Sequence, residues 1–367
     1  MNYNVIMKHF RSIGANGPAA MRRELRPQEQ RGPQRQDHRG VAFREQQQRG
    51  DQPGQQPHHL RHANVHRPMS LINLFRRKPK PPKPPKPQMI AGWNAPKADQ
   101  FLAHYEARAL TKALVPGLLR WGGTVSQHKA DMGEVNALVA IANDIGVPVV
   151  IPADIYDSTP QEAVERIQAH LDAGVKVAGV ELGNETYLQQ YRDRIASPEE
   201  YMVKARALRD AIRTVLPNMP CGIIMAPTAS MRDPDSAGMH PRYLTRWNEV
   251  VLRETWPDAV VIHCYVNPQR TGPSYVDHAN AVATVLKSLE PRRVWLTEVG
   301  VQGECPPDIR QDHYDHMLLV ASNAGNVDLY CWHSLAGQGT NAAIRVTSDR
   351  RGGVKAEYTE FGALLTK

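Results

Sequence analysis

From residue 88 onward, short apolar runs alternate with longer amphipathic segments. Short apolar runs bounded by turn residues are typical of buried strands, and apolar residues that recur every three or four positions are typical of helices. Eight strands are predicted on this basis, at residues 89–94, 117–124, 147–154, 177–186, 221–227, 259–267, 293–301 and 327–334. Eight helices are predicted after them, at residues 98–114, 135–145, 160–173, 198–216, 241–254, 275–289, 308–323 and 357–365.

Signals at the helix ends support this division of the chain. Thr159 suits the N-cap of the third predicted helix and Gly174 suits its C-terminal stop, while Ser197 and Pro198 suit the start of the fourth. Strict alternation of strand and helix indicates a parallel sheet. A (β/α)₈ barrel typically takes about 250 residues, so the 280 residues of the region 88–367 predict a single TIM barrel.

A doubly wound nucleotide-binding sheet is the alternative for an alternating chain, and two observations disfavour it. That fold needs a glycine-rich turn after its first strand, whereas this chain has Trp93-Asn94-Ala95-Pro96 there. The run Gly337-Gln338-Gly339-Thr340-Asn341-Ala342 resembles such a turn but precedes a strand-like run at 343–347 rather than a helix.

Residues 1–87 have a different composition, rich in Gln, Arg, Pro, Gly and His, and they predict a disordered basic arm ahead of the barrel. The arm ends in KPKPPKPPKP at 78–87, a sequence typical of an extended polyproline II spacer. Arg76, Arg77, Lys78 and the lysines that follow could contact an anionic surface. Met69 is a plausible alternative start, so residues 1–68 need not belong to the native product.

The basic character of the protein belongs to this arm. Residues 1–86 hold 18 Lys and Arg against 5 Asp and Glu, a balance of +13, while the whole chain is +8, which leaves −5 for the rest. Specific nucleic-acid binding by the barrel is therefore not expected, and binding by the arm alone remains a separate alternative.

Targeting and redox features are sparse. No stretch has the roughly 18 to 20 apolar residues of a membrane span, and the apolar patch at 71–75 precedes its basic residues, the reverse of a secretory signal. The site of action is therefore left open. Cysteines stand at four positions without CxxC spacing, so neither a structural zinc site nor a disulfide framework is expected.

Polar and aromatic residues gather at the predicted strand ends, where the active sites of (β/α)₈ barrels lie. Two of them are glutamates, Glu185 after the fourth strand and Glu298 in the seventh, 113 residues apart. A pair of carboxyl groups is what glycoside hydrolysis needs, one to protonate the leaving oxygen and one to attack or stabilise the sugar carbon. The strand-end residues are Trp93, Asn94, Arg120, Trp121, Asp154, Asn184, Glu185, Thr228, His263, Tyr265, Glu298, Trp332 and His333.

This set resembles the (β/α)₈ retaining glycosidases of clan GH-A. Members carry an Asn-Glu pair at the end of strand four and a second Glu at the end of strand seven, and Asn184-Glu185 and Glu298 match these positions. The clan often has an Arg after strand two, a His or aromatic residue near strand six and a Trp near strand eight. Arg120, His263 with Tyr265, and Trp332 fill those places, and the resemblance covers residues 88–367.

The resemblance implies roles for these residues. Glu185 would be the acid/base and Glu298 the nucleophile of a retaining O-glycosyl hydrolase acting on an oligo- or polysaccharide. Arg120 could keep Glu298 ionised, and Asn184 could donate to the sugar 2-hydroxyl. The remaining expected substrate-binding residues are Tyr265, which could orient the nucleophile, His263, and three tryptophans that could stack on sugar faces, Trp93, Trp121 and Trp332.

Competing functions are a carbohydrate-binding barrel without turnover and a Schiff-base or phosphate-binding barrel. The pair of glutamates disfavours the first, and the absence of Lys from the predicted strand ends disfavours the second. Asp154 is better explained as a cap for the following helix than as a catalytic group. Asp312, His313, Asp315 and His316 fall in the first turns of a predicted helix, where Asp favours the helix dipole, so no metal and no cofactor is expected.

Overall fold

A computed structural model describes residues 88–95, 105–114, 116–121, 132–228, 231, 239–267, 274–337, 342–348 and 354–366. The predicted basic arm, with its proposed contact to an anionic surface, lies outside these residues.

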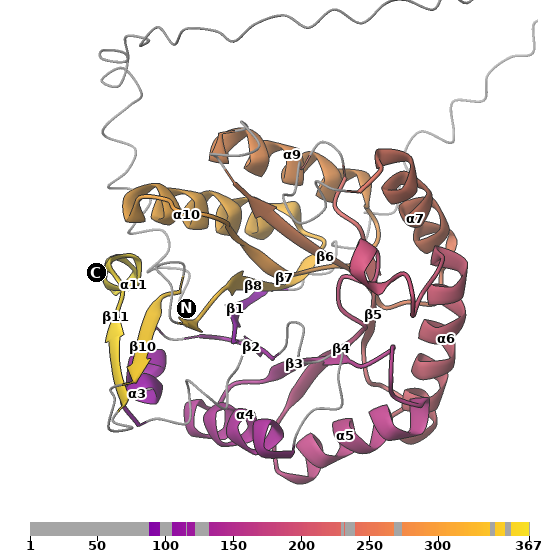
Figure 1. Ribbon diagram of the computed structural model, residues 1–367, viewed down its shortest axis with the longest axis horizontal. Coiled ribbons are helices and arrows are strands. Elements are labelled where there is room, and N and C mark those ends of the chain that lie inside the picture. The colour runs from indigo at the N-terminus through magenta and orange to yellow at the C-terminus, as the bar shows by residue number, and fades with distance from the viewer. Residues whose placement is uncertain are drawn as a thin grey trace, which may run out of the picture. The chain divides into compact units, whose positions relative to one another are not determined.

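Eight parallel strands form a closed barrel in sequential order, with β1 pairing β8 (Figure 1). The strands are β1 Ile90–Asn94, β2 Leu119–Arg120, β3 Val149–Ala153, β4 Val177–Leu182, β5 Cys221–Met225, β6 Ala259–Val266, β7 Val294–Val301 and β8 Val327–His333. The predicted TIM barrel is therefore confirmed. Strand β2 is much shorter than the predicted 117–124, of which residues 122–124 lie outside the described part.

Helices surround the barrel in the described part of the chain (Figure 1). They are α3 Tyr105–Ala113, α4 Met132–Ile145, α5 Pro160–Asp172, α6 Pro198–Val215, α7 Pro241–Arg253, α9 Tyr275–Ser288 and α10 Pro307–Ala324, with a 3₁₀ turn η4 at Gln189–Tyr191. Thr159 caps α5 in a reciprocal capping box with Glu162, and Ser197 caps α6 ahead of Pro198, as the sequence predicts. None of the helices in the described ranges is long and apolar enough to cross a membrane.

The C-terminal segment differs from the prediction of a single helix at 357–365. Glu357 and Tyr358 belong to a strand, β11 Val354–Tyr358, and the helix α11 begins later, at Glu360–Leu365, capped by Thr359. Strand β11 pairs with β10 Ile344–Ser348, which also pairs with β9 Ala336–Gly337. This small sheet is fixed to α3, since the Tyr358 hydroxyl donates to the Leu110 carbonyl at 2.8 Å.

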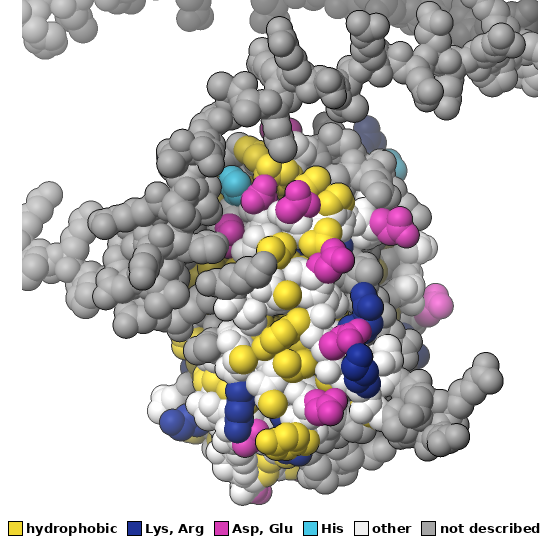
Figure 2. Space-filling model, turned by 90° about the vertical axis from the view of Figure 1, so that its left-hand side faces the viewer, with side chains coloured by type: hydrophobic (Ala, Val, Ile, Leu, Met, Phe, Trp, Pro, Cys, Tyr) yellow, Lys and Arg dark blue, Asp and Glu magenta, His cyan; other side chains and the backbone are white. Residues whose placement is uncertain are grey.

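Figure 2 shows apolar side chains interspersed with acidic and basic ones on the side of the molecule that carries β10, β11 and α11.

A tryptophan fills the barrel below the strand ends. A Cβ at Gly179 of β4 would lie 2.4 Å from the Trp295 ring, and one at Gly222 of β5 would lie 2.8 Å from it. Trp295 is on β7, which is not a neighbour of β4 or β5 in the sheet, so its ring reaches them through the barrel interior. A side chain at either glycine would collide with this ring, so Gly179 and Gly222 leave the space that the ring fills.

Candidate active site

A tight turn after β4 presents the first glutamate. The chain leaves β4 at Leu182, and Gly183 then has φ of 103°, a conformation that a Cβ disfavours. Glu185 itself has φ of 45°, uncommon for a residue other than glycine and costing about 1 to 3 kcal/mol. Such strain concentrates at functional sites. The strained residue, Glu185, has a side chain that is 13% exposed at the barrel mouth.

The second glutamate is placed by an irregularity between strands. Ile262 of β6 pairs with Leu296, but His263 pairs with Glu298, so the register skips Thr297. Extra residues of this kind re-aim side chains beside active sites. Here the skip sets Glu298 beside His263, with the Glu298 side chain 7% exposed.

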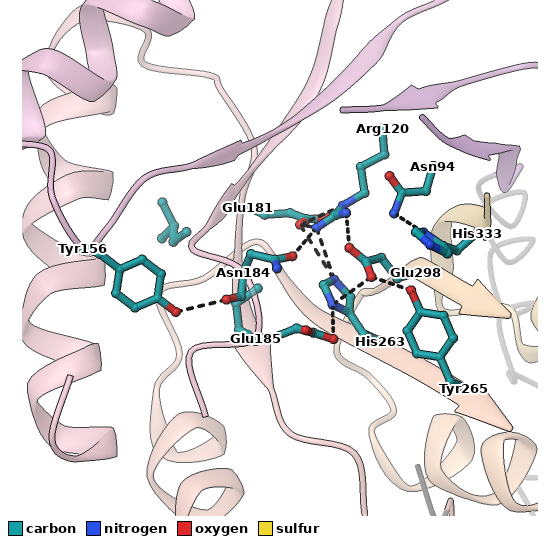
Figure 3. Close-up of polar contacts among 12 residues, drawn as sticks. Asn94, Arg120, Tyr156, Glu181, Asn184, Glu185, His263, Tyr265, Glu298 and His333 are labelled. Atoms are coloured by element: carbon teal, nitrogen blue, oxygen red, sulfur yellow. Dashed lines mark hydrogen bonds and ion pairs between the residues drawn. The ribbon is translucent and has the colours of Figure 1, made fainter. Parts of the chain in front are cut away.

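The two carboxyl groups meet around His263 (Figure 3). Nδ1 of His263 lies 3.3 Å from Glu185 Oε1 and 3.8 Å from Glu298 Oε2. One carboxylate oxygen of Glu185, one of Glu298 and a ring nitrogen of His263 all lie within 4.8 Å of one another. The expected pairing of the two glutamates across the barrel mouth is therefore present.

Two donors hold the Glu298 carboxylate. Nη1 of Arg120 donates to Oε1, and the Tyr265 hydroxyl donates to Oε2 at 2.5 Å. Burial alone would raise the pKa of Glu298, but the charges of His263 and Arg120 outweigh burial and hold this pKa well below its usual range. Glu298 is therefore ionised at neutral pH.

A third carboxylate at the site, which the strand-end pattern does not reveal, belongs to Glu181, within β4 and fully buried. Nε of Arg120 lies 3.0 Å from both Glu181 oxygens, and Nη2 lies 2.6 Å from Oε2. Burial would raise the pKa of Glu181, but Arg120 and then His263 hold it at about 2. The available signal was a charged residue inside an otherwise apolar strand run.

His263 is a cation in this environment. Burial would lower its pKa, but Glu298, Glu181 and Glu185 raise it to about 10. A group of three residues with metal-ligand chemistry, Glu185, His263 and Glu298, is present. A ligating histidine must be neutral, and one oxygen of Glu298 already accepts a hydrogen bond from Arg120.

Asn184 and His333 complete the polar lining (Figure 3). Oδ1 of Asn184 accepts from Arg120 Nη2 at 2.7 Å, and its backbone carbonyl accepts from the Tyr156 hydroxyl at 3.1 Å. Nδ1 of His333 lies 2.9 Å from Asn94 Nδ2, and its ring meets Tyr265 edge-on at 5.6 Å between centroids. Asn94 and His333 were recognised as strand-end residues but were not assigned to substrate binding.

The three tryptophans expected to stack on sugars lie elsewhere, so this prediction is wrong. Trp93 is 3% exposed and stacks on Tyr314 of α10, and Trp332 is fully buried against the same ring. Trp121 is also buried and packs beside His170 of α5. Successive strand side chains point to opposite faces, so the outward direction of Trp93 and Trp332 leaves their neighbours Asn94 and His333 at the site.

Asp154 serves the local backbone, close to the role predicted for it. Oδ1 accepts from the backbone N–H of Tyr156 at 2.9 Å and of Asp157 at 3.2 Å, and Oδ2 accepts from the Ser158 hydroxyl. The cap of α5 is Thr159 rather than Asp154. Of the residues considered and rejected as metal ligands, His313 is buried against Trp332 at 5.7 Å between centroids.

Comparison with known proteins gives matches only among solved structures, since no family model and no curated protein sequence matches this chain. The family 51 α-L-arabinofuranosidase from Bifidobacterium longum matches with a TM-score of 0.54 at 13% identity, over 77% of this chain and 75% of that one. The GH51 arabinofuranosidase from Xanthomonas axonopodis pv. citri matches with a TM-score of 0.52 at 12% identity, over 71% and 65%.

The α-L-arabinofuranosidase from Thermotoga maritima matches with a TM-score of 0.50 at 14% identity, and this chain spans 60% of its length. The barrel is thus a fold that this chain shares with these arabinofuranosidases, to which it is distantly similar. At such low sequence identity the structural likeness shows the fold alone, and the chemistry must be argued from the site itself.

Proposed function

We propose that this protein is a retaining glycoside hydrolase that cleaves O-glycosidic bonds of an oligo- or polysaccharide. The observation that carries the proposal is the meeting of the two glutamates around His263, where one oxygen of Glu185 lies within 4.8 Å of one oxygen of Glu298. Retaining sites hold their two carboxyl groups about 5 to 5.5 Å apart, whereas inverting sites need about 6.5 to 9.5 Å to admit a water molecule.

Glu298 is the proposed nucleophile. Its carboxylate is ionised and is held at both oxygens, by Arg120 and by Tyr265. In the first step an oxygen of Glu298 forms a bond to the anomeric carbon while the bond to the leaving oxygen breaks. A covalent glycosyl-enzyme results, with the sugar attached to Glu298.

Glu185 is the proposed acid/base. In the first step its carboxyl proton passes to the leaving oxygen, and in the second step it takes a proton from the water that displaces Glu298. His263 Nδ1, 3.3 Å from Oε1, orients this carboxyl group from inside the barrel. Asn184 is oriented by the contact of its Oδ1 with Arg120, and its amide nitrogen is the proposed donor to the sugar 2-hydroxyl.

Digestion of a glycan library and a panel of aryl glycosides by the full chain tests the proposal. Released sugar is expected, and ¹H NMR of the first product should show the anomeric configuration of the substrate. Glu298→Gln is expected to abolish release. Binding without release by the wild-type chain would support the alternative, a carbohydrate-binding barrel that has no turnover, and an inverted first product would contradict the retaining mechanism.

A further inference from the structure

The buried carboxylate of Glu181 accepts hydrogen bonds along one edge of the Arg120 guanidinium. Nε shares its hydrogen between the two Glu181 oxygens at 3.0 Å each, and Nη2 reaches Oε2 at 2.6 Å. Both side chains are fully excluded from solvent. A guanidinium is planar and its donors form a rigid fork, so a carboxylate bound along one edge also fixes the direction of every other N–H.

The directions fixed in this way lead to the two other functional groups at the barrel mouth. Nη1, on the far side of the guanidinium, donates to Glu298 Oε1. The second hydrogen of Nη2 is directed to Asn184 Oδ1 at 2.7 Å. Arg120 hydrogen-bonds all three of Glu181, Glu298 and Asn184, whereas His263 Nε2 lies farther from Glu181, at 3.9 Å from Oε2. Rotation of the Arg120 fork would therefore loosen its contacts with Glu298 and Asn184 together.

Stability alone is a poor explanation for this arrangement. Removing two charges from water costs several kcal/mol per ion, and apolar pairs of similar volume are often as stable. Here the buried pair is attached to the proposed nucleophile. We propose that Glu181 is a positioning residue, which aims Arg120 at Glu298 and Asn184 and so prepares the nucleophile for attack. This inference rests on the proposed glycosidase function.

Two variants separate positioning from charge. Glu181→Gln keeps the shape but removes the charge, and its amide N–H would face the Arg120 donors. Glu181→Asp keeps the charge but withdraws it by one methylene. If Glu181 positions Arg120, both variants loosen its contact with Glu298. An adjacent Arg lowers a carboxyl pKa by about 1 to 3 units, so the pKa of Glu298 should rise by about that amount in both.

The readout is the acidic limb of kcat/KM against pH, together with the ¹³C chemical shift of the Glu298 carboxyl followed through a pH titration. The Glu298 signal is assigned by its loss in Glu298→Gln. Because the NMR titration needs no turnover, it tests the positioning role even if the full-length protein hydrolyses no glycoside. Absence of hydrolysis by the wild type would then count against the proposed function alone.

A rise of the Glu298 pKa in both variants is the expected result. If Glu181 acted only through its charge, Arg120 would stay in place. Glu181→Gln would then lower the Glu298 pKa, because a repelling anion is lost, and Glu181→Asp would leave it nearly unchanged. If Glu181 served only stability, the melting temperature would fall and the Glu298 titration of the folded protein would not move. Either of these results overturns the inference.

A matched control is Asp328→Asn. Asp328 lies on β8 and forms an ion pair with Arg293, which directly precedes β7. Like Glu181, it is therefore a strand carboxylate paired with an arginine from another part of the barrel. Asp328 is the second residue of β8, at the opposite end of the strand from His333 and the site. Its loss is expected to leave the Glu298 titration unchanged, and a shift equal to that of the Glu181 variants would show that any lost ion pair has this effect.

Discussion

Replacing Tyr265 with Phe removes one hydroxyl from the nucleophile and leaves the rest of the ring in place. The hydroxyl donates to Glu298 Oε2 at 2.5 Å, and both residues are nearly buried. A hydrogen bond to a charged group contributes about 1.5 to 3 kcal/mol. Because it favours the ionised form of Glu298, its loss should raise the pKa of that carboxyl by about 1 to 2 units, at about 1.4 kcal/mol per unit.

The assay is the pH dependence of kcat/KM between about pH 2.5 and 7. In the wild type the limb that reports Glu298 lies near the low pKa set by its neighbours, and in the variant it should move to higher pH. Activity at neutral pH should also fall by about 10- to 100-fold, since the hydroxyl no longer steadies the attacking oxygen. The edge-on contact with His333 involves the ring and should survive.

Tyr201→Phe is the control, because Tyr201 is also a buried tyrosine with a bonded hydroxyl. Its oxygen donates to the Leu182 carbonyl at 2.9 Å and accepts from the Ile224 N–H at 2.7 Å, joining β4 and β5 from outside the barrel. Losing these bonds should cost about 1 to 3 kcal/mol of stability without moving the acidic limb. An acidic limb in Tyr265→Phe that stays at the wild-type pH would refute the reasoning.

Three further predictions concern stability. Trp332→Ala should lower the free energy of unfolding by about 3 to 5 kcal/mol through the cavity it leaves, measured by urea denaturation, whereas a sugar-stacking Trp332 would chiefly raise KM. The free energy of unfolding should be greatest between about pH 4.5 and 6.5. In acid it should fall by about 3 kcal/mol as Glu181, whose pKa is held at about 2, becomes protonated, and in base it should fall again as pH rises toward 10 and His263 loses its proton. A melting temperature that is flat from pH 2.5 to 6 would contradict this. Removing residues 1–87 should leave the melting temperature and the turnover of small substrates nearly unchanged, and a fall of several degrees would show that the segment packs on the barrel.

Much of the fold could be predicted from sequence because each barrel strand is an apolar run and each helix carries recognisable caps. The C-terminal sheet is predicted only in part: the strand-like run at 343–347 corresponds to β10, but Val354–Tyr358 is short and of mixed polarity, and the pattern assigns its last two residues to the helix that follows. Its strand conformation depends on pairing with Ile344–Ser348, a contact that periodicity does not encode.

Site residues at the strand ends could be predicted, but side-chain directions could not. Trp93 and Asn94 are adjacent at the end of one strand, and which of them faces the site depends on the register of the barrel. Register shifts between β6 and β7 and between β7 and β8 alter that choice locally. Glu181 was overlooked because a strand buried on both faces lacks the alternation that marks an inward position.

In the proposed double displacement Glu298 is the nucleophile and Glu185 the acid/base, and the product that Glu185→Ala forms in azide tests this division of roles most directly. With an aryl glycoside whose leaving group needs little protonation, the first step should survive and the glycosyl-enzyme should accumulate, because no base activates water. Azide should then release a glycosyl azide with the anomeric configuration of the substrate. An azide product of inverted configuration, or no azide product from a folded variant that still binds the glycoside, would contradict the assignment.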